Sequence, residues 1–179
     1  MNNLMRKILA GRSVYAFSSN LLTDEDLMLV LEEGKFLSKA ESNQVWHFTA
    51  VQNRDVIREI HGLGKQYLAV GDPSVSAGTD LLLNMPMLLV ISGCDVKYAG
   101  EAADTLFGSM MLAAEKHGIN ACWLGSVSEH ILQESSSAVK KLLGIPDHYT
   151  PLCMGAFGYK ASARQPRITK VDSIINIIR

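Results

Sequence analysis

The chain has 179 residues, of which 47% are hydrophobic and 20% are charged, and its formal net charge is -1. This length suits one domain with a substantial core, so we expect residues 1–179 to fold as one unit. The near-neutral charge gives no sign of a nucleic-acid or anionic-membrane partner. The longest apolar runs are too short to span a membrane, and residues 1–7 lead into no apolar signal region. The cytoplasm is therefore the expected compartment.

Two helices are predicted near the start of the chain. Residues 2–10 place apolar side chains on one helical face, and Gly11 follows where a helix commonly ends. Thr23 and Asp26 resemble a capping box, which predicts that a second helix begins there. The apolar series that follows indicates that this helix ends near Gly34.

The next region predicts the first two strands. After a polar loop over 38–44, residues 46–51 alternate bulky and smaller side chains, a pattern typical of a strand. A short helix is expected over 55–60. Residues 87–92 form a continuous apolar run, which predicts a strand buried on both faces.

The strongest helix prediction covers residues 101–117, whose broad apolar face indicates a central, buried helix. Gly118 is expected to end this helix. Residues 120–124 then predict a strand that ends at Gly125.

The last part of the chain predicts a further helical stretch and a final strand. Ser126 and Glu129 resemble a second capping box, and the helical pattern continues with interruptions to about Gly144. Residues 152–157 predict the last core strand. Residues 171–179 are too apolar for an exposed tail, so we expect them to pack on a partner subunit. This order of elements favours a mixed sheet covered by helices.

Several common types of active site are not indicated by the sequence. The GxSxG, HExxH, phosphate-loop and dinucleotide-fingerprint motifs are absent. The three cysteines lie in apolar surroundings without CxxC spacing, which favours buried thiols. His117, Cys122 and His130 are conceivable metal ligands, but they lack recognisable ligand spacing, so we expect no metal site.

Four separated segments resemble the FMN-dependent nitroreductase family, and together they span almost the whole chain. The first, residues 11–17, is similar to the family's opening RRSxRxF. In the family this motif holds the FMN phosphate and the pyrimidine side of the flavin. Arg12 and Ser13 suit that task because a guanidinium and a hydroxyl donate hydrogen bonds to phosphate oxygens. Taken alone, Arg12-Ser13 is a common dipeptide and favours an exposed loop arginine.

The second segment, residues 38–48, resembles the family's PSxxNxQPW, a loop that reaches the flavin of the other subunit. Gln44 and Trp46 fit this pattern, and a core position for Trp46 is compatible with it. The third segment includes the central helix and the run Cys122-Trp123-Leu124-Gly125, similar to the family's W-x-G strand end. The resemblance implies that main-chain amides of Leu124 and Gly125 face the flavin N5.

The fourth segment contains Leu143-Gly144-Ile145-Pro146 and the closing strand to Tyr159, which resemble the family's LGIP and GYP-type end. Basic residues follow it, in a region from which the family supplies a cation to the FMN phosphate. The resemblance as a whole implies a set of cofactor-binding residues and no catalytic side chain. These residues are Arg12, Ser13, Tyr15, Ser38, Lys39, Ser42, Gln44, Leu124, Gly125 and Arg164.

The resemblance implies an α+β fold with a mixed, mainly antiparallel sheet flanked by helices, in an intertwined homodimer. The apolar end of the chain, about 168–179, would be an arm across the dimer interface. The implied activity is ping-pong hydride transfer from NAD(P)H through the flavin to a nitroaromatic or quinone-like acceptor. The flavin carries the chemistry, so no side-chain acid or base is required. Tyr67 or Phe107 could shape the acceptor pocket, although core packing is the expected role of Phe107.

The chain also departs from the family pattern. Gly11 and Tyr15 stand where the family has basic residues, while Ser38, Lys39 and Ser42 replace its Pro, Ser and Asn. A missing cation near the pyrimidine edge would weaken stabilisation of the reduced flavin, unless Lys39 or Arg12 supplies it. The departures leave open a flavin-binding sensor or carrier without turnover. A dehalogenating or flavin-consuming relative of the same fold is a weaker alternative.

Overall fold

The computed structural model describes residues 13–37, 46–68, 82–94 and 99–161. Within them, four strands form one sheet in the order β1-β2-β4-β3. The strands are β1 (Trp46–Val51), β2 (Leu88–Gly93), β3 (Asn120–Trp123) and β4 (Thr150–Gly158). Every pairing between these strands is antiparallel. The predicted α+β fold with a mainly antiparallel sheet flanked by helices is confirmed, although the strands of the described residues include no parallel pair that would make the sheet mixed.

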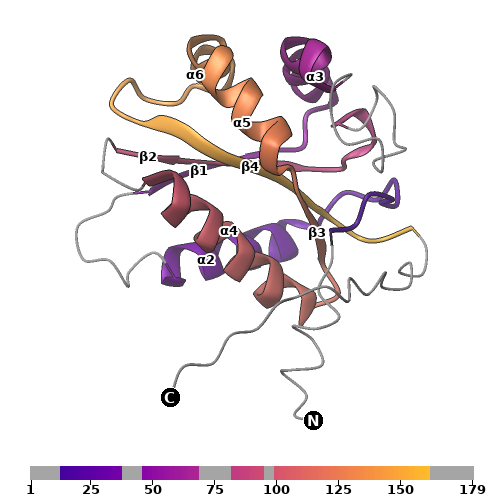
Figure 1. Ribbon diagram of the computed structural model, residues 1–179. Coiled ribbons are helices and arrows are strands. Elements are labelled where there is room, and N and C mark those ends of the chain that lie inside the picture. Colours follow the sequence, from indigo (N-terminus) through magenta and orange to yellow (C-terminus); the bar gives the residue numbers. More distant parts are fainter. Residues whose placement is uncertain (1–12, 38–45, 69–81, 95–98, 162–179) are drawn as a thin grey trace, which may run out of the picture.

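The sheet lies between two layers of helices (Figure 1). One layer contains α3 (Arg54–Leu68), α5 (Gly125–Glu134) and α6 (Ser136–Leu143), while the other contains α2 (Asp24–Leu37) and α4 (Ala99–Glu115). A short 3-10 helix, η3 (Leu82–Asn84), precedes β2. None of the helices within the described ranges has the length and apolar character needed to cross a membrane.

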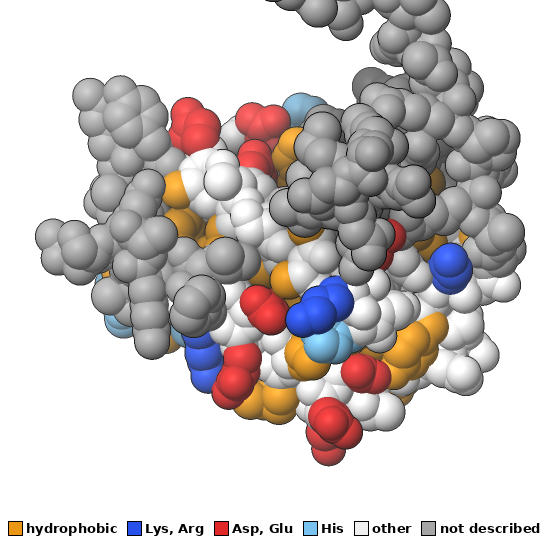
Figure 2. Space-filling view, turned by 90° about the horizontal axis from the view of Figure 1, so that it is seen from below, with side chains coloured by type: hydrophobic (Ala, Val, Ile, Leu, Met, Phe, Trp, Pro, Cys, Tyr) orange, Lys and Arg blue, Asp and Glu red, His pale blue; other side chains and the backbone are white. Residues whose placement is uncertain are grey.

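The core has two parts, one on each face of the sheet. β2 is buried along its whole length, as predicted, because helices cover both of its faces. On the α2/α4 side, Phe107 is fully buried and its ring centroid lies 5.2 Å from that of Phe157. This confirms the core role expected for Phe107. Figure 2 shows the outer surface of this layer, where hydrophobic and acidic side chains are interspersed.

The first capping box is confirmed. The amide of Asp26 donates a hydrogen bond to Thr23 Oγ1 at 3.2 Å, and α2 begins at Asp24. Asp26 also accepts a hydrogen bond from the Tyr159 hydroxyl, which joins the start of α2 to the end of β4. The predicted end of this helix is wrong, because α2 continues past Gly34 to Leu37. Gly34 is instead a position of close packing between α2 and α4, since a Cβ there would lie 2.9 Å from Met110 Cε.

Two further boundaries differ from the prediction. The helix expected over 55–60 extends from Arg54 to Leu68 and passes through Gly64, where a Cβ would lie 2.4 Å from Ile131 Cδ1. The second capping box is also wrong, because α5 begins at Gly125 with Leu124 at the N-cap and no side-chain cap. The other predicted strands and the central helix agree with the structure within a few residues. The helix predicted over 2–10 and the tail over 171–179 lie outside the described residues.

Candidate functional site

The segment 13–19 lies against the outer edge of the sheet. The Val14 amide donates a hydrogen bond to the Ala121 carbonyl of β3 at 2.8 Å. Further along, the Ser18 amide donates to the Tyr159 carbonyl at 2.7 Å, just beyond β4. These bonds place Ser13 beside β3, although more than a hundred residues separate them in sequence. The structure thus brings the first and third of the family-like segments together.

Ser13 contacts the sheet through Cys122. Its side chain is half-buried and forms a hydrogen bond with the Cys122 thiol. Burial raises the pKa of Cys122 to about 12, and the hydrogen bond with Ser13 lowers it by a smaller amount. The thiol therefore stays protonated at neutral pH and is a poor nucleophile. Cys122 therefore lies beside Ser13 as a buried, protonated thiol.

The end of β3 presents an aromatic ring and an unusual glycine. Trp123 is 45% exposed, whereas Leu124 is buried. Gly125 begins α5 with a φ of 32°, in the region that favours glycine. The Leu124 amide donates to the Met154 carbonyl at 3.3 Å, so it is engaged within the sheet. The main-chain role predicted for this strand end is therefore left to Gly125 and to the amides that follow it.

The beginning of α5 offers hydrogen-bond donors. The first amides of a helix have no acceptor within the helix, and Leu124 at the N-cap supplies none through its side chain. The Ser128 hydroxyl donates a hydrogen bond to the Gly125 carbonyl at 2.8 Å. This bond involves a carbonyl and none of the first amides of α5. Partial positive charge at a helix N-terminus favours electron-rich ligand atoms. An exposed indole, a half-buried hydroxyl and these amides suit a flat, polar ring such as a flavin.

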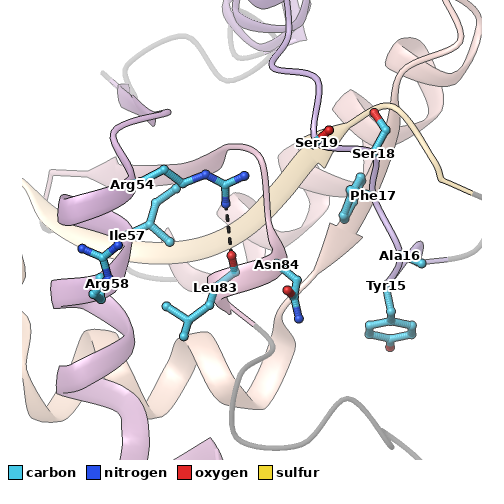
Figure 3. Close-up of a pocket in the computed structure, with 10 residues that line it drawn as sticks. All are labelled: Tyr15, Ala16, Phe17, Ser18, Ser19, Arg54, Ile57, Arg58, Leu83 and Asn84. Atoms are coloured by element: carbon cyan, nitrogen blue, oxygen red, sulfur yellow. Dashed lines mark hydrogen bonds between the residues drawn. The ribbon is translucent and has the colours of Figure 1, made fainter.

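A pocket of about 580 Å³ opens beside this region, between segment 15–19 and the start of α3 (Figure 3). We call it the Arg54 pocket. Arg54 donates from Nη1 to the carbonyls of Leu83 and Met85, both at 3.0 Å. Its ten lining residues are Tyr15, Ala16, Phe17, Ser18, Ser19, Arg54, Ile57, Arg58, Leu83 and Asn84.

The structure describes four of the ten predicted cofactor-binding residues. Ser13, Leu124 and Gly125 lie at or beside the β3 end, and Tyr15 lines the Arg54 pocket with 46% of its surface exposed. The other six lie outside the described residues, namely Arg12, Ser38, Lys39, Ser42, Gln44 and Arg164. Nothing is described of the Tyr67 side chain.

The sequence reasoning missed Arg54, Ser18 and the exposed position of Trp123. The available signal for Arg54 was its place just beyond the end of a strand, at the start of the next helix. Metal ligation gains no support, since the described parts of the chain contain no group of three or more His, Cys, Asp or Glu able to hold an ion. His117, Cys122 and His130 accordingly form no such group.

The fold and site define an α+β protein whose β3 ends in an exposed indole beside the N-terminus of a helix. The sequence profile of the Nitroreductase family matches residues 8–159. The chain therefore belongs to the nitroreductase family, as the four segments predicted.

Individual relatives agree with this assignment. The FMN reductase (NADPH) of Bacillus subtilis is 26% identical over 191 residues, covering 95% of this chain and 72% of the relative. A protein of Archaeoglobus fulgidus, whose name includes NAD(P)H nitroreductase, is 25% identical over 162 residues, covering 89% of this chain and 86% of its own. The crystal structure of a nitroreductase with bound FMN from Bacteroides fragilis superposes with a TM-score of 0.75 at 25% identity, covering 99% of this chain and 100% of the other.

Proposed function

We propose that the protein is an FMN-dependent oxidoreductase that uses NAD(P)H to reduce a small nitroaromatic or quinone-like acceptor. The observation that carries this proposal is the position of Ser13 beside the β3 end, where Gly125 opens α5. The names of the relatives support it, because one is an FMN reductase (NADPH) and another is a nitroreductase with bound FMN.

The described residues have distinct tasks in this proposal. The Ser13 hydroxyl and the first amides of α5 would donate hydrogen bonds to FMN, while Trp123 supplies an apolar surface beside them. Cys122, held protonated by burial, positions Ser13 without reacting. The predicted residues outside the described ranges, Arg12 and Arg164 among them, would complete the phosphate site. When bound, FMN supplies the hydride-transfer chemistry.

The protein itself needs no acid or base side chain for this reaction. Its contribution is to bind a donor and an acceptor in turn at the same open strand end, which gives ping-pong kinetics. We further propose that the protein is a cytoplasmic homodimer. The predicted second segment would then reach the flavin of the other subunit, with residues of about 168–179 as the arm between subunits.

The test begins with the visible absorption spectrum of the freshly purified protein and chromatography of the cofactor released by heat. We expect stoichiometric FMN and bleaching of its absorbance on addition of NADH or NADPH under nitrogen. A colourless protein that fails to take up added FMN would refute the proposal.

A flavin-binding sensor or carrier is the second candidate function. Tyr15, half-exposed where the family has a basic residue, is the observation that favours it. This alternative predicts stoichiometric FMN that neither NADH nor NADPH bleaches, whereas dithionite, which needs no binding site, does. The same experiment therefore separates the two candidates.

A further inference from the structure

We infer that the Arg54 pocket binds the phosphate groups of the nicotinamide dinucleotide. This inference rests on the proposed function and extends it to a named subsite. Of the ten residues that line the pocket, two are arginines and none is acidic, in a chain whose net charge is -1. Such a lining favours an anionic ligand with several acceptor oxygens, which is the chemistry of a phosphate.

Arg54 is the better placed of the two arginines. Arg58 forms an ion pair with Asp55 at 2.5 Å, which offsets its charge. Arg54 donates to carbonyls from Nη1, so its position is fixed while its full charge is retained. A guanidinium has five N–H donors, and further donors on Arg54 have no bond to any described residue. In Figure 3 the guanidinium extends from α3 across the space towards η3.

Ser18 supplies a second, independent observation. Its Oγ is shielded from solvent and has no hydrogen-bond partner among the described residues. Buried hydroxyls are nearly always paired, and Ser18 belongs to the pocket lining, so its hydroxyl is available to a ligand bound there. A phosphate oxygen would accept this bond after a rotation about the single χ1 angle of Ser18.

The pocket and the proposed flavin site lie along one extended segment. Ser13 contacts β3, Tyr15 lines the near side of the pocket and Ser18 lies further along it. Five residues of extended chain span about 16 Å. An elongated dinucleotide whose nicotinamide ring lies at the β3 end would therefore extend its phosphates into the Arg54 pocket. The single phosphate of FMN is assigned elsewhere, to Arg12 and its neighbours.

The test uses the FMN-loaded full-length protein and three hydride donors: NADPH, NADH and N-benzyl-1,4-dihydronicotinamide, which carries no phosphate. Donor affinity comes from the concentration dependence of flavin bleaching, and the affinities of NADP⁺ and NAD⁺ from calorimetry. We expect Arg54→Gln to weaken dinucleotide binding about tenfold and to leave the benzyl donor unchanged. Ser18→Ala should weaken binding about threefold without lowering Tm, because it removes an unpaired hydroxyl. Lys141→Gln, at an exposed position of α6, is the charge-matched control.

A loss confined to NADPH would assign the pocket to the 2′-phosphate, and an equal loss for NADPH and NADH would assign it to the shared diphosphate. The inference is overturned if both variants bind dinucleotides as the wild type does, or if the benzyl donor weakens in proportion. FMN affinity and Tm are measured for each variant to detect a folding defect. If Arg54→Gln has such a defect, the dinucleotide affinity of Ser18→Ala decides whether the inference holds. If none of the donors bleaches the wild-type flavin, the proposed function itself has failed.

Discussion

Tyr15 is a described residue at which the chain lacks the family's expected cation. It is 46% exposed and lines the Arg54 pocket. We predict that Tyr15→Arg binds FMN more tightly and raises its midpoint potential, because a nearby cation favours the more negative, reduced cofactor. Fluorescence titration and spectroelectrochemistry measure the two quantities, with Tyr15→Phe as the control. If neither quantity changes, the missing cation is already supplied by another residue, and Arg12 and Lys39 are the candidates to test.

The cysteines give a prediction that depends on pKa. Burial raises the pKa of Cys122 to about 12, and burial together with Asp104 raises that of Cys153 further. A raised pKa keeps a thiol protonated, so at pH 8 both of these thiols lack the thiolate form that reacts. We expect a disulfide reagent at pH 8 to modify only Cys94, which is half-buried, in the native protein. Cys94→Ser should abolish this reaction, and rapid modification of a second thiol would contradict the prediction.

Among the secondary-structure elements, β4 contains a glycine whose role is close packing. A Cβ on Gly155 would lie 2.0 Å from Phe107 Cζ and 2.7 Å from the Cys122 carbonyl oxygen, which belongs to the backbone and cannot rotate away. We expect Gly155→Ala to lower the free energy of unfolding by about 3 kcal/mol. Gly62→Ala is the matched control, since nothing lies within 4 Å of its Cβ position on α3. Alanine there should stabilise the helix by up to about 1 kcal/mol. Urea unfolding compares the two, and equal stabilities would contradict this account.

The same contacts explain which element boundaries could be predicted from sequence. The Thr23 capping box is a local interaction between neighbouring residues, so its pattern correctly located the start of α2. The predicted helices ended near Gly34 and at residue 60, before Gly64, yet both glycines lie within helices and permit a close approach by a side chain from another helix. That approach is a tertiary contact without a local signature. Ser126 failed as a cap because Gly125 had already turned the chain into α5.

The candidate site likewise contains features that could be predicted from the sequence and features that could not. The resemblance assigned both Ser13 and Gly125 to the cofactor site, and the structure places the first segment against β3 through the bond between Val14 and Ala121. The Arg54 pocket could not be foreseen, since its lining comes from three segments that are far apart in sequence. Only the fold places Ser18 and Arg54 in the same pocket. Residues that are brought together only by tertiary structure have no characteristic spacing in the sequence.

At the scale of the whole molecule, the outward face of α4 bears on the proposed homodimer. Thr105 Oγ1 donates to the Glu101 carbonyl at 2.8 Å, and Ser109 Oγ donates to the Thr105 carbonyl at 3.0 Å. Both hydroxyls are thus satisfied within their own helix. Leu112, on the next turn of this face, is 44% exposed. The face is therefore less polar than its sequence suggests, and it belongs to the layer whose surface is shown in Figure 2.

We predict that this face of α4 packs against a second copy of the chain, so that Leu112→Glu dissociates the dimer. A carboxylate buried at such a contact without a partner would be strongly unfavourable. Sedimentation equilibrium over a range of protein concentrations should show a dissociation constant raised at least a hundredfold. Bound FMN should fall with it, because residues 38–44 are predicted to reach the flavin of the other subunit. Leu21→Glu, which changes an equally exposed leucine at 46%, should leave both quantities unchanged. A wild-type monomer would refute the dimer itself, whereas a Leu112→Glu dimer of normal affinity and FMN content would place the subunit contact on another face.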